Sequence, residues 1–180
     1  TDTAGVEAQQ NWNNLNASSQ GDGLIEWTGE ANGWEMKGDS TYVDSNGSDT
    51  TLSLSAWSND PYFSSVTGSA NGDEKLLSGE AYGGFGGSLT VSDVPYDTYD
   101  LIVYSVDRAG HTGDHEITIS DGSTTYYVNP TDTATDIHTQ MSNTTPGSAD
   151  EGTYVCFSGL SGSTTFTWDG PTYKAGVTGF

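Results

Sequence analysis

The sequence has few basic residues, one cysteine and no long hydrophobic run. Only 4 Lys and Arg residues stand against 25 Asp and Glu residues, which gives a formal net charge of −21. Because phosphate neutralisation needs clustered Lys and Arg, we expect no nucleic-acid partner and no partner on an anionic membrane surface. The single cysteine, Cys156, cannot form an intramolecular disulfide, and its simplest expected state is a small buried apolar side chain.

No apolar run reaches the ~20 residues that a membrane-spanning helix needs, and no segment has the pattern of a signal peptide. The chain starts and stops abruptly, which suggests a module taken from a longer protein. A large negative charge keeps a protein soluble at high ionic strength, where screening shortens the reach of self-repulsion. We therefore expect a secreted protein from a salty habitat.

Several catalytic signatures are also missing from the sequence. It contains no phosphate-binding G-x-x-x-x-G-K-[ST] loop, no H-E-x-x-H, no zinc spacing of Cys and His, and no G-x-S-x-G elbow. With 25 acidic residues, some carboxylate pair will lie at the separation that glycoside hydrolysis requires by chance alone. None sits in a recognisable catalytic context, so we assign no catalytic residue and expect no enzymatic activity.

The residues that are abundant suit an all-β protein. The chain of 180 residues contains 24 Gly, 32% hydrophobic residues and 11% aromatic residues. This composition favours short strands joined by many turns, with aromatic side chains supplying much of the core. We predict one domain over 1–180, an antiparallel β-sandwich of jelly-roll type with about ten short strands.

The most apolar predicted strand belongs to Val94–Tyr104, which opens with a turn carrying Pro95 and Asp97 and which we place centrally in a sheet. Its period-2 alternation sets Tyr99, Leu101 and Val103 on one face and Asp100, Ile102 and Tyr104 on the other. A polar loop, Ser105–Glu116, is expected to follow it. Loops delivered by a rigid strand often carry binding residues.

Other segments are predicted with less detail. Ile117–Ser120 and Thr124–Val128 form a hairpin around Asp121-Gly122. The chain from Gly5 to Leu15 is expected to be an edge strand and a loop. Asp60–Gly79 is expected to be irregular, with one helical turn near Leu76, and Thr131–Glu151 is expected to be a long polar loop.

A structural calcium ion is a further expectation, because Asp-rich loops supply the oxygen ligands that Ca²⁺ prefers. Asp44–Asp49 begins like a calcium loop, but its twelfth position is Ser55 instead of Glu. That motif therefore fails, and we assign no metal site.

Sugar sites pair aromatic platforms with planar polar side chains, and the sequence offers both in expected loops or at strand ends. Arg108 stands beside Asp107, with which it forms either a local salt bridge or a fork for ligand oxygens. Tyr82 lies among Gly, Glu and Ala, apart from any predicted strand. The predicted ligand-binding residues are Trp57, Tyr62, Tyr82, Asp107, Arg108, His111 and His115.

Several stretches together resemble one known kind of module. They are Gly5–Asn14, Ser53–Ser58, Gly72–Gly79, Val94–Tyr104, Tyr154–Leu160 and Gly176–Phe180. In this order they are similar to a galactose-binding-like β-sandwich module of secreted proteins from marine planctomycetes and related bacteria. The resemblance implies a non-catalytic carbohydrate-binding module, and in relatives the segment after the central strand carries acidic residues and an Arg, matched here by Asp107 and Arg108.

The expected function is to target an attached polysaccharide-degrading enzyme, in the same parent chain, to a marine or algal polysaccharide. The −21 charge favours a neutral galactan or another neutral glycan over a sulfated one. We expect a monomer. The alternatives are a glycoside hydrolase or polysaccharide lyase domain, and a calcium-stabilised surface adhesion module without a sugar site.

Overall fold

The structure is a computed structural model of the chain. It describes residues 5–7, 25–27, 34–37, 42–44, 46–58, 61–63, 72–76, 79–82, 86–107, 115–131, 139–170 and 175–180. Within these ranges, the side chains of 25–27, 34–37, 61–63, 74–75 and 79–82 are not described.

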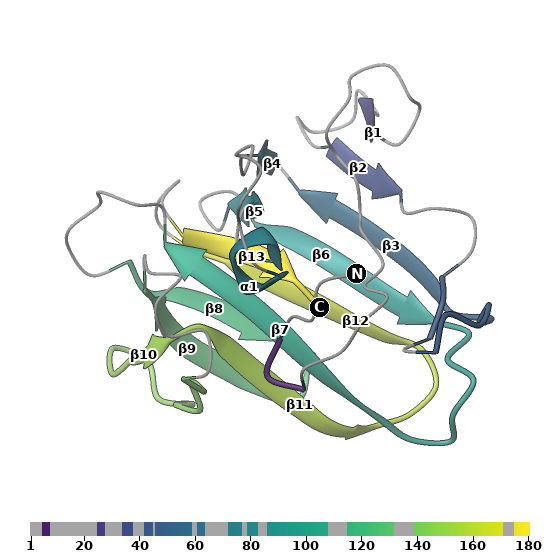
Figure 1. The fold of residues 1–180 in the computed structure, drawn as a ribbon. Helices are drawn as coiled ribbons and strands as arrows, with labels where there is room; N and C mark the ends of the chain where they lie inside the picture. Colours follow the sequence, from purple (N-terminus) through teal and green to yellow (C-terminus); the bar gives the residue numbers. More distant parts are fainter. Residues whose placement is uncertain are drawn as a thin grey trace.

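Two β-sheets form the body of the molecule (Figure 1). The first is an eight-stranded sheet in the order β1 (Ile25–Trp27), β2 (Trp34–Lys37), β3 (Ser53–Ser58), β6 (Gly87–Ser92), β12 (Thr164–Asp169), β8 (Ile117–Ser120), β9 (Thr125–Pro130) and β10 (Asp150–Gly152). The second is a five-stranded sheet in the order β11 (Tyr154–Leu160), β7 (Tyr99–Asp107), β13 (Ala175–Gly179), β5 (Gly79–Tyr82) and β4 (Pro61–Phe63).

The predicted all-β sandwich is confirmed. The described residues contain thirteen strands and one five-residue helix, α1 (Gly72–Leu76), which agrees with the helical turn expected near Leu76. Neighbouring strands pair antiparallel except β9 and β10, which run parallel. Jelly-roll connectivity stays a prediction. In the described part of the chain, no helix has the length and apolar character needed to span a bilayer.

The core lies between the two sheets and follows the period-2 pattern of the strands. In β12, Phe166 and Trp168 are buried, whereas Thr165 and Thr167, which alternate with them, are exposed. Phe166 packs against Phe157 from the other sheet, with ring centroids 5.1 Å apart. Large aromatic rings supply the apolar area that a chain with 32% hydrophobic residues needs for a stable core.

The two faces of β7 are those that its alternation predicted: one is apolar, and the other combines the exposed Asp100 with Ile102 and Tyr104. Val103 points into the core between the sheets, whereas Tyr104 is buried in a second cluster with Ile102, Tyr154 and other residues. The strand lies between β11 and β13. As predicted, the stretch opens with bends at 95–98 and the strand begins at Tyr99, but it continues past the predicted Tyr104 to Asp107.

The predicted β8–β9 hairpin is confirmed. Ile117 pairs with Val128, and Ser120 pairs with Thr125. The Asp121 carboxylate closes the turn, because Oδ1 accepts the backbone N–H of Ser123 at 2.9 Å and that of Thr124 at 2.6 Å. Such side-chain to backbone bonds explain why Asp is favoured at tight turns.

Three coarse predictions were wrong in part. The described N-terminal residues Gly5–Glu7 form a turn instead of an edge strand. The segment predicted as irregular, Asp60–Gly79, contains β4, which pairs with β5. The end of the predicted Thr131–Glu151 loop forms β10, because its backbone finds ladder partners along β9.

Gly87 provides a test of the core packing. A Cβ atom on Gly87 would overlap the indole ring of Trp168, which is only 1% exposed. We expect Gly87→Ala to lower the free energy of unfolding by about 1–3 kcal/mol, because a buried ring has little room to move. Urea unfolding would measure the change. The neighbouring Ser88→Ala, on the outer side of β6, should shift stability by less than ~0.5 kcal/mol, and an equal loss in both variants would contradict this account.

Candidate functional site

The aromatic residues predicted to bind a ligand lie in strands. Trp57 alternates with the buried Ala56 and Ser58 in β3, so it faces outward, and it is partly exposed. On that outer face it stands opposite Ser88, which is followed across the sheet by Thr167. Trp57 therefore shares this row of the outer face with two hydroxyl-bearing residues, Ser88 and Thr167.

The remaining aromatic predictions are only partly described. Tyr62 lies in β4, and Tyr82 ends β5, where its backbone pairs with Gly176. The prediction that Tyr82 lies apart from any strand was therefore wrong. The side chains of Tyr62 and Tyr82 lie outside the described residues, as do Arg108 and His111 entirely.

Asp107 and His115 are brought together, but inside the protein. His115 Nδ1 and Asp107 Oδ2 are 2.7 Å apart, and the two side chains are only 5% and 7% exposed. The backbone N–H of His115 also donates to the Asn129 side chain at 3.1 Å. Asp107 ends β7, and its N–H donates to the Thr131 carbonyl at 3.2 Å. The prediction that Asp107 lies in a loop was wrong, because β7 keeps pairing with β13 to this residue.

Burial makes this pair a poor part of a sugar-binding rim. A carboxylate and an imidazole held at 2.7 Å already satisfy each other in a water-poor environment, where an unpaired partner would be costly. Among the described residues, the second Asp107 oxygen, Oδ1, has no hydrogen-bond partner. We therefore assign the Asp107–His115 pair a structural role at the end of β7, where His115 also bonds Asn129 of β9.

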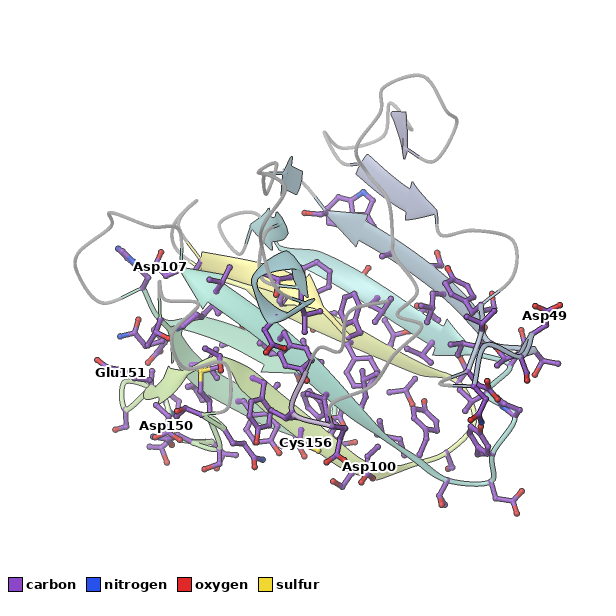
Figure 2. All side chains as sticks on the ribbon, viewed as in Figure 1. Asp49, Asp100, Asp107, Asp150, Glu151 and Cys156 are labelled. Carbon is purple, nitrogen blue, oxygen red and sulfur yellow. The ribbon has the colours of Figure 1, made fainter. Side chains whose placement is uncertain are left out.

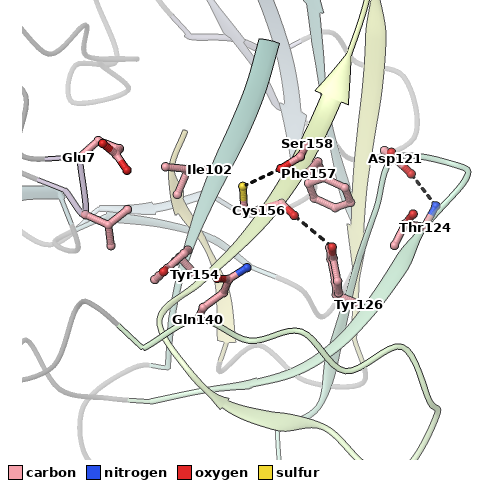
Figure 3. Close-up of a pocket in the computed structure, with 11 residues that line it drawn as sticks. Glu7, Ile102, Asp121, Thr124, Tyr126, Gln140, Tyr154, Cys156, Phe157 and Ser158 are labelled. Carbon is pink, nitrogen blue, oxygen red and sulfur yellow. Dashed lines mark hydrogen bonds between the residues drawn. The ribbon is translucent and has the colours of Figure 1, made fainter. Parts of the chain in front are cut away.

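A groove with a volume of about 880 Å³ crosses β11, the edge strand of the five-stranded sheet. Figure 3 shows its lining residues, and Figure 2 shows that one of them, Cys156, lies well away from Asp107. The lining comes from four parts of the chain that are distant in sequence: the N-terminal turn, β7, the β8–β9 hairpin and the stretch from Gln140 through β11. The lining residues are Val6, Glu7, Ile102, Asp121, Thr124, Tyr126, Gln140, Tyr154, Cys156, Phe157 and Ser158.

The aromatic part of the groove is held in place by contacts with the core. The Tyr126 hydroxyl donates to the Cys156 carbonyl at 3.0 Å, and its ring lies 5.0 Å from the ring of Phe157. Tyr154 packs against Tyr104, with ring centroids 6.1 Å apart. Burial raises the pKa of Tyr126, and the nearby Cys156 and Asp121 add to the effect. These rings lose little further freedom when a ligand binds.

One wall of the groove is the N-terminal turn, which two hydrogen bonds fix to α1 and to the second cluster. The Gly5 N–H donates to Asp73 Oδ1 of α1 at 2.7 Å. The Val6 N–H donates to the Tyr104 hydroxyl at 2.8 Å, and Val6 packs in the same cluster as Tyr104. Glu7, the next residue, is exposed at the groove.

Polar groups surround the aromatic rings. Asp121 and Thr124 come from the hairpin turn, opposite Glu7 in Figure 3. The exposed Gln140 forms an isolated parallel bridge with Tyr154. The groove therefore presents carboxylates, an amide and hydroxyls beside two tyrosine rings. This combination can hydrogen-bond a polyhydroxylated ligand while covering its apolar faces.

Cys156 lines this groove and is only partly buried. Its Sγ atom lies 3.5 Å from Ser158 Oγ. The expectation of a buried apolar cysteine was wrong, because Cys156 alternates with the core residues Val155 and Phe157 and so points to the outer face of the edge strand.

The Asp44–Asp49 loop is organised by its own backbone. Asp44 Oδ1 accepts the N–H groups of Asn46 at 2.8 Å and Ser48 at 2.9 Å. These bonds lower the pKa of Asp44, with the Ser48 amide as the largest cause. Within the described ranges, no three His, Cys, Asp or Glu side chains gather as metal ligands. The structural calcium ion remains a prediction without a site.

Sequence reasoning missed the groove because no local pattern encodes it. The predicted ligand-binding residues include none of Glu7, Gln140, Tyr126 and Tyr154. The available signal was the register of β11: alternation from the buried Val155 and Phe157 places Tyr154, Cys156 and Ser158 together on the outer face. Pairing of distant segments supplied the other residues.

Comparisons of this chain with known proteins found no similar protein. No protein-family model matches the chain, and neither the curated proteins nor the solved structures contain a match. The likeness to galactose-binding-like modules therefore stays a prediction, and the chemistry of the groove has to support any functional proposal.

The buried pair gives one prediction. We expect Asp107→Ala to lower the free energy of unfolding by about 2–4 kcal/mol, since it leaves the buried His115 without its carboxylate partner. Chemical denaturation would measure this loss. Asp97→Ala removes an exposed carboxylate and should change stability by less than ~0.5 kcal/mol. If Asp107→Ala were as stable as Asp97→Ala, the structural role of the pair would be wrong.

The second cluster gives a pH-dependent prediction. Burial raises the pKa of Tyr104 above the value of an unfolded tyrosine, near pH 10. The unfolded chain then loses this proton at a lower pH than the folded protein does, so the stability contributed below about pH 10 is lost as pH rises through the folded pKa. Unfolding free energies measured from pH 8 to pH 11 should therefore fall at the alkaline end. Tyr104→Phe should weaken that fall, and an identical profile in the variant would refute the assignment.

Proposed function

We propose that this chain is a non-catalytic carbohydrate-binding module whose ligand lies in the groove across β11. The observation that carries the proposal is the pairing of two fixed tyrosine rings with carboxylate, amide and hydroxyl groups in one open groove of about 880 Å³. Sugar rings present apolar C–H faces and rims of hydroxyls. Tyr126 and Tyr154 would cover the faces, while Glu7, Asp121 and Gln140 would bond the rims.

The electrostatics favour a glycan without anionic groups. The described lining carries two carboxylates, Glu7 and Asp121, and none of its residues is Lys or Arg. The chain as a whole has a formal charge of −21. A sulfated or uronic-acid polymer would meet repulsion both in the groove and from the surrounding field. A neutral galactan, such as the marine or algal polymer expected from the sequence, would not.

The proposed biological role follows from tethering. A module attached to a polysaccharide-degrading enzyme, in a secreted parent chain, raises the concentration of substrate near the catalytic domain. The groove is open at the surface, so each contact covers only part of a sugar chain and individual affinities should be modest.

The single cysteine offers a direct test, because it lies inside the groove. We expect a bound oligosaccharide to slow the reaction of Cys156 with a maleimide by at least about tenfold at saturation, since the ligand would cover the thiol. The rate would be measured by mass spectrometry with oligosaccharides that first retard the protein in affinity electrophoresis. Retardation without protection of Cys156 would place the sugar site elsewhere on the molecule.

Two tyrosine variants separate the groove from the rest of the surface. Tyr154→Ala should weaken binding about tenfold, or about 1.4 kcal/mol, by removing one aromatic face. Tyr96→Ala is the matched control, because Tyr96 is 62% exposed and is not among the groove residues. The groove assignment would fail if Tyr96→Ala lost binding and Tyr154→Ala kept it.

A further inference from the structure

The two carboxylates of the groove stand on opposite sides of the tyrosine rings, with Glu7 and Asp121 separated by β11 in Figure 3. We propose that they select a sugar chain carrying ammonium groups, that is, a polymer of 2-amino-2-deoxyhexose units. This inference rests on the proposed function and, among glycans without anionic groups, favours a cationic polymer over the neutral galactan. It makes Glu7 and Asp121 the residues that determine specificity.

Glu7 is held at the groove although it lies near the start of the described chain. The two residues before it are both anchored by their backbone N–H groups: Gly5 to Asp73 at 2.7 Å and Val6 to the Tyr104 hydroxyl at 2.8 Å. Tyr104 is only 1% exposed. These bonds fix the backbone that carries Glu7 at the groove, so only its exposed side chain has to be ordered when it meets a cation.

Asp121 is fixed by a different device. Its Oδ1 accepts the N–H groups of Ser123 and Thr124, which closes the β8–β9 turn. Those two bonds engage one oxygen of the carboxylate and leave Oδ2 out of the turn. The turn therefore presents a carboxylate of fixed orientation on the side of the groove opposite Glu7.

The tyrosine rings support the same ligand. An ammonium group near the face of an aromatic ring is attracted by the electron density of that ring, and a nearby carboxylate adds a charged hydrogen bond. A glucosamine-type unit offers a C–H face for Tyr126 or Tyr154 and an ammonium for Glu7 or Asp121. Its N-acetylated counterpart has the same ring but a neutral amide, so it keeps the first contact and loses the second.

The chain provides a closely matched test. We would compare a glucosamine hexamer with its fully N-acetylated form and with a neutral galactan oligomer, at about pH 6, where an amine of this kind is protonated.

The double variant Glu7→Gln with Asp121→Asn removes both groove carboxylates, and the amide introduced by Asp121→Asn keeps an oxygen that can close the turn. The control double variant, Asp97→Asn with Glu151→Gln, removes two exposed carboxylates outside the groove lining. Both double variants change the formal charge equally, so general attraction of a polycation to an acidic protein affects them alike.

We expect the glucosamine hexamer to bind the unmodified chain at least about tenfold more tightly than the acetylated form and to protect Cys156 from maleimide. The groove variant should lose this preference, while the control variant keeps it. Thermal unfolding would verify that both variants are folded. Affinities would be measured at 0.15 M salt, where charges beyond about 8 Å are largely screened.

Two other outcomes would overturn the inference and remain distinct. The groove binds sugar without selecting ammonium groups if the neutral galactan protects Cys156 and the glucosamine hexamer binds no more tightly than its acetylated form. The same conclusion follows if the control variant loses as much affinity as the groove variant. If none of the sugars protects Cys156, the proposed function at this groove fails as well.

Discussion

Strand β7 packs apolar side chains on both of its faces, against the core between the sheets on one and within the second cluster on the other. The rest of the structure depends on this double packing. The inner face of β7, through Val103, joins the core between the sheets. Its outer face, through Ile102 and Tyr104, supports the N-terminal turn and α1. One wall of the groove therefore rests on the same strand that holds the core together. Mutations on either face of β7 should affect both the stability of the sandwich and the shape of the groove.

Several acidic residues in the described part of the chain accept hydrogen bonds from backbone N–H groups. With only 4 Lys and Arg residues for 25 carboxylates, ion pairs cannot balance most of the charge. Carboxylates instead close turns or bind neighbouring strands: Asp44 and Asp121 accept two amides each, Asp100 accepts the Gly159 amide at 2.8 Å, and Asp150 accepts the Ser142 amide at 2.9 Å. Such bonds give a carboxylate a partner without requiring a cation. The high negative charge thus contributes to loop structure as well as to solubility.

The sequence predicted the features that short-range patterns encode. Alternation in β7 predicted which side chains share a face, and Asp121-Gly122 predicted the hairpin. It could not predict the Asp107–His115 pair, although both residues were singled out, because their pairing depends on how far β7 continues along β13. The sequence could not predict the groove either. Glu7 and Asp121 are far apart in the sequence, and only the second cluster and the hairpin bring them to one site.

The position of the groove has a consequence for what it can bind. Because it crosses an edge strand, it is bounded by turns and not by the centre of a sheet, and turns change more easily than strands do. The tyrosine rings are nevertheless anchored in the core: Tyr126 contacts Phe157, which contacts Phe166. The rings that would cover sugar faces are thus held firmly, whereas the acidic groups that would set specificity sit on a turn and near the chain's beginning. This division allows the charge preference of the groove to change by single substitutions without disturbing the sandwich.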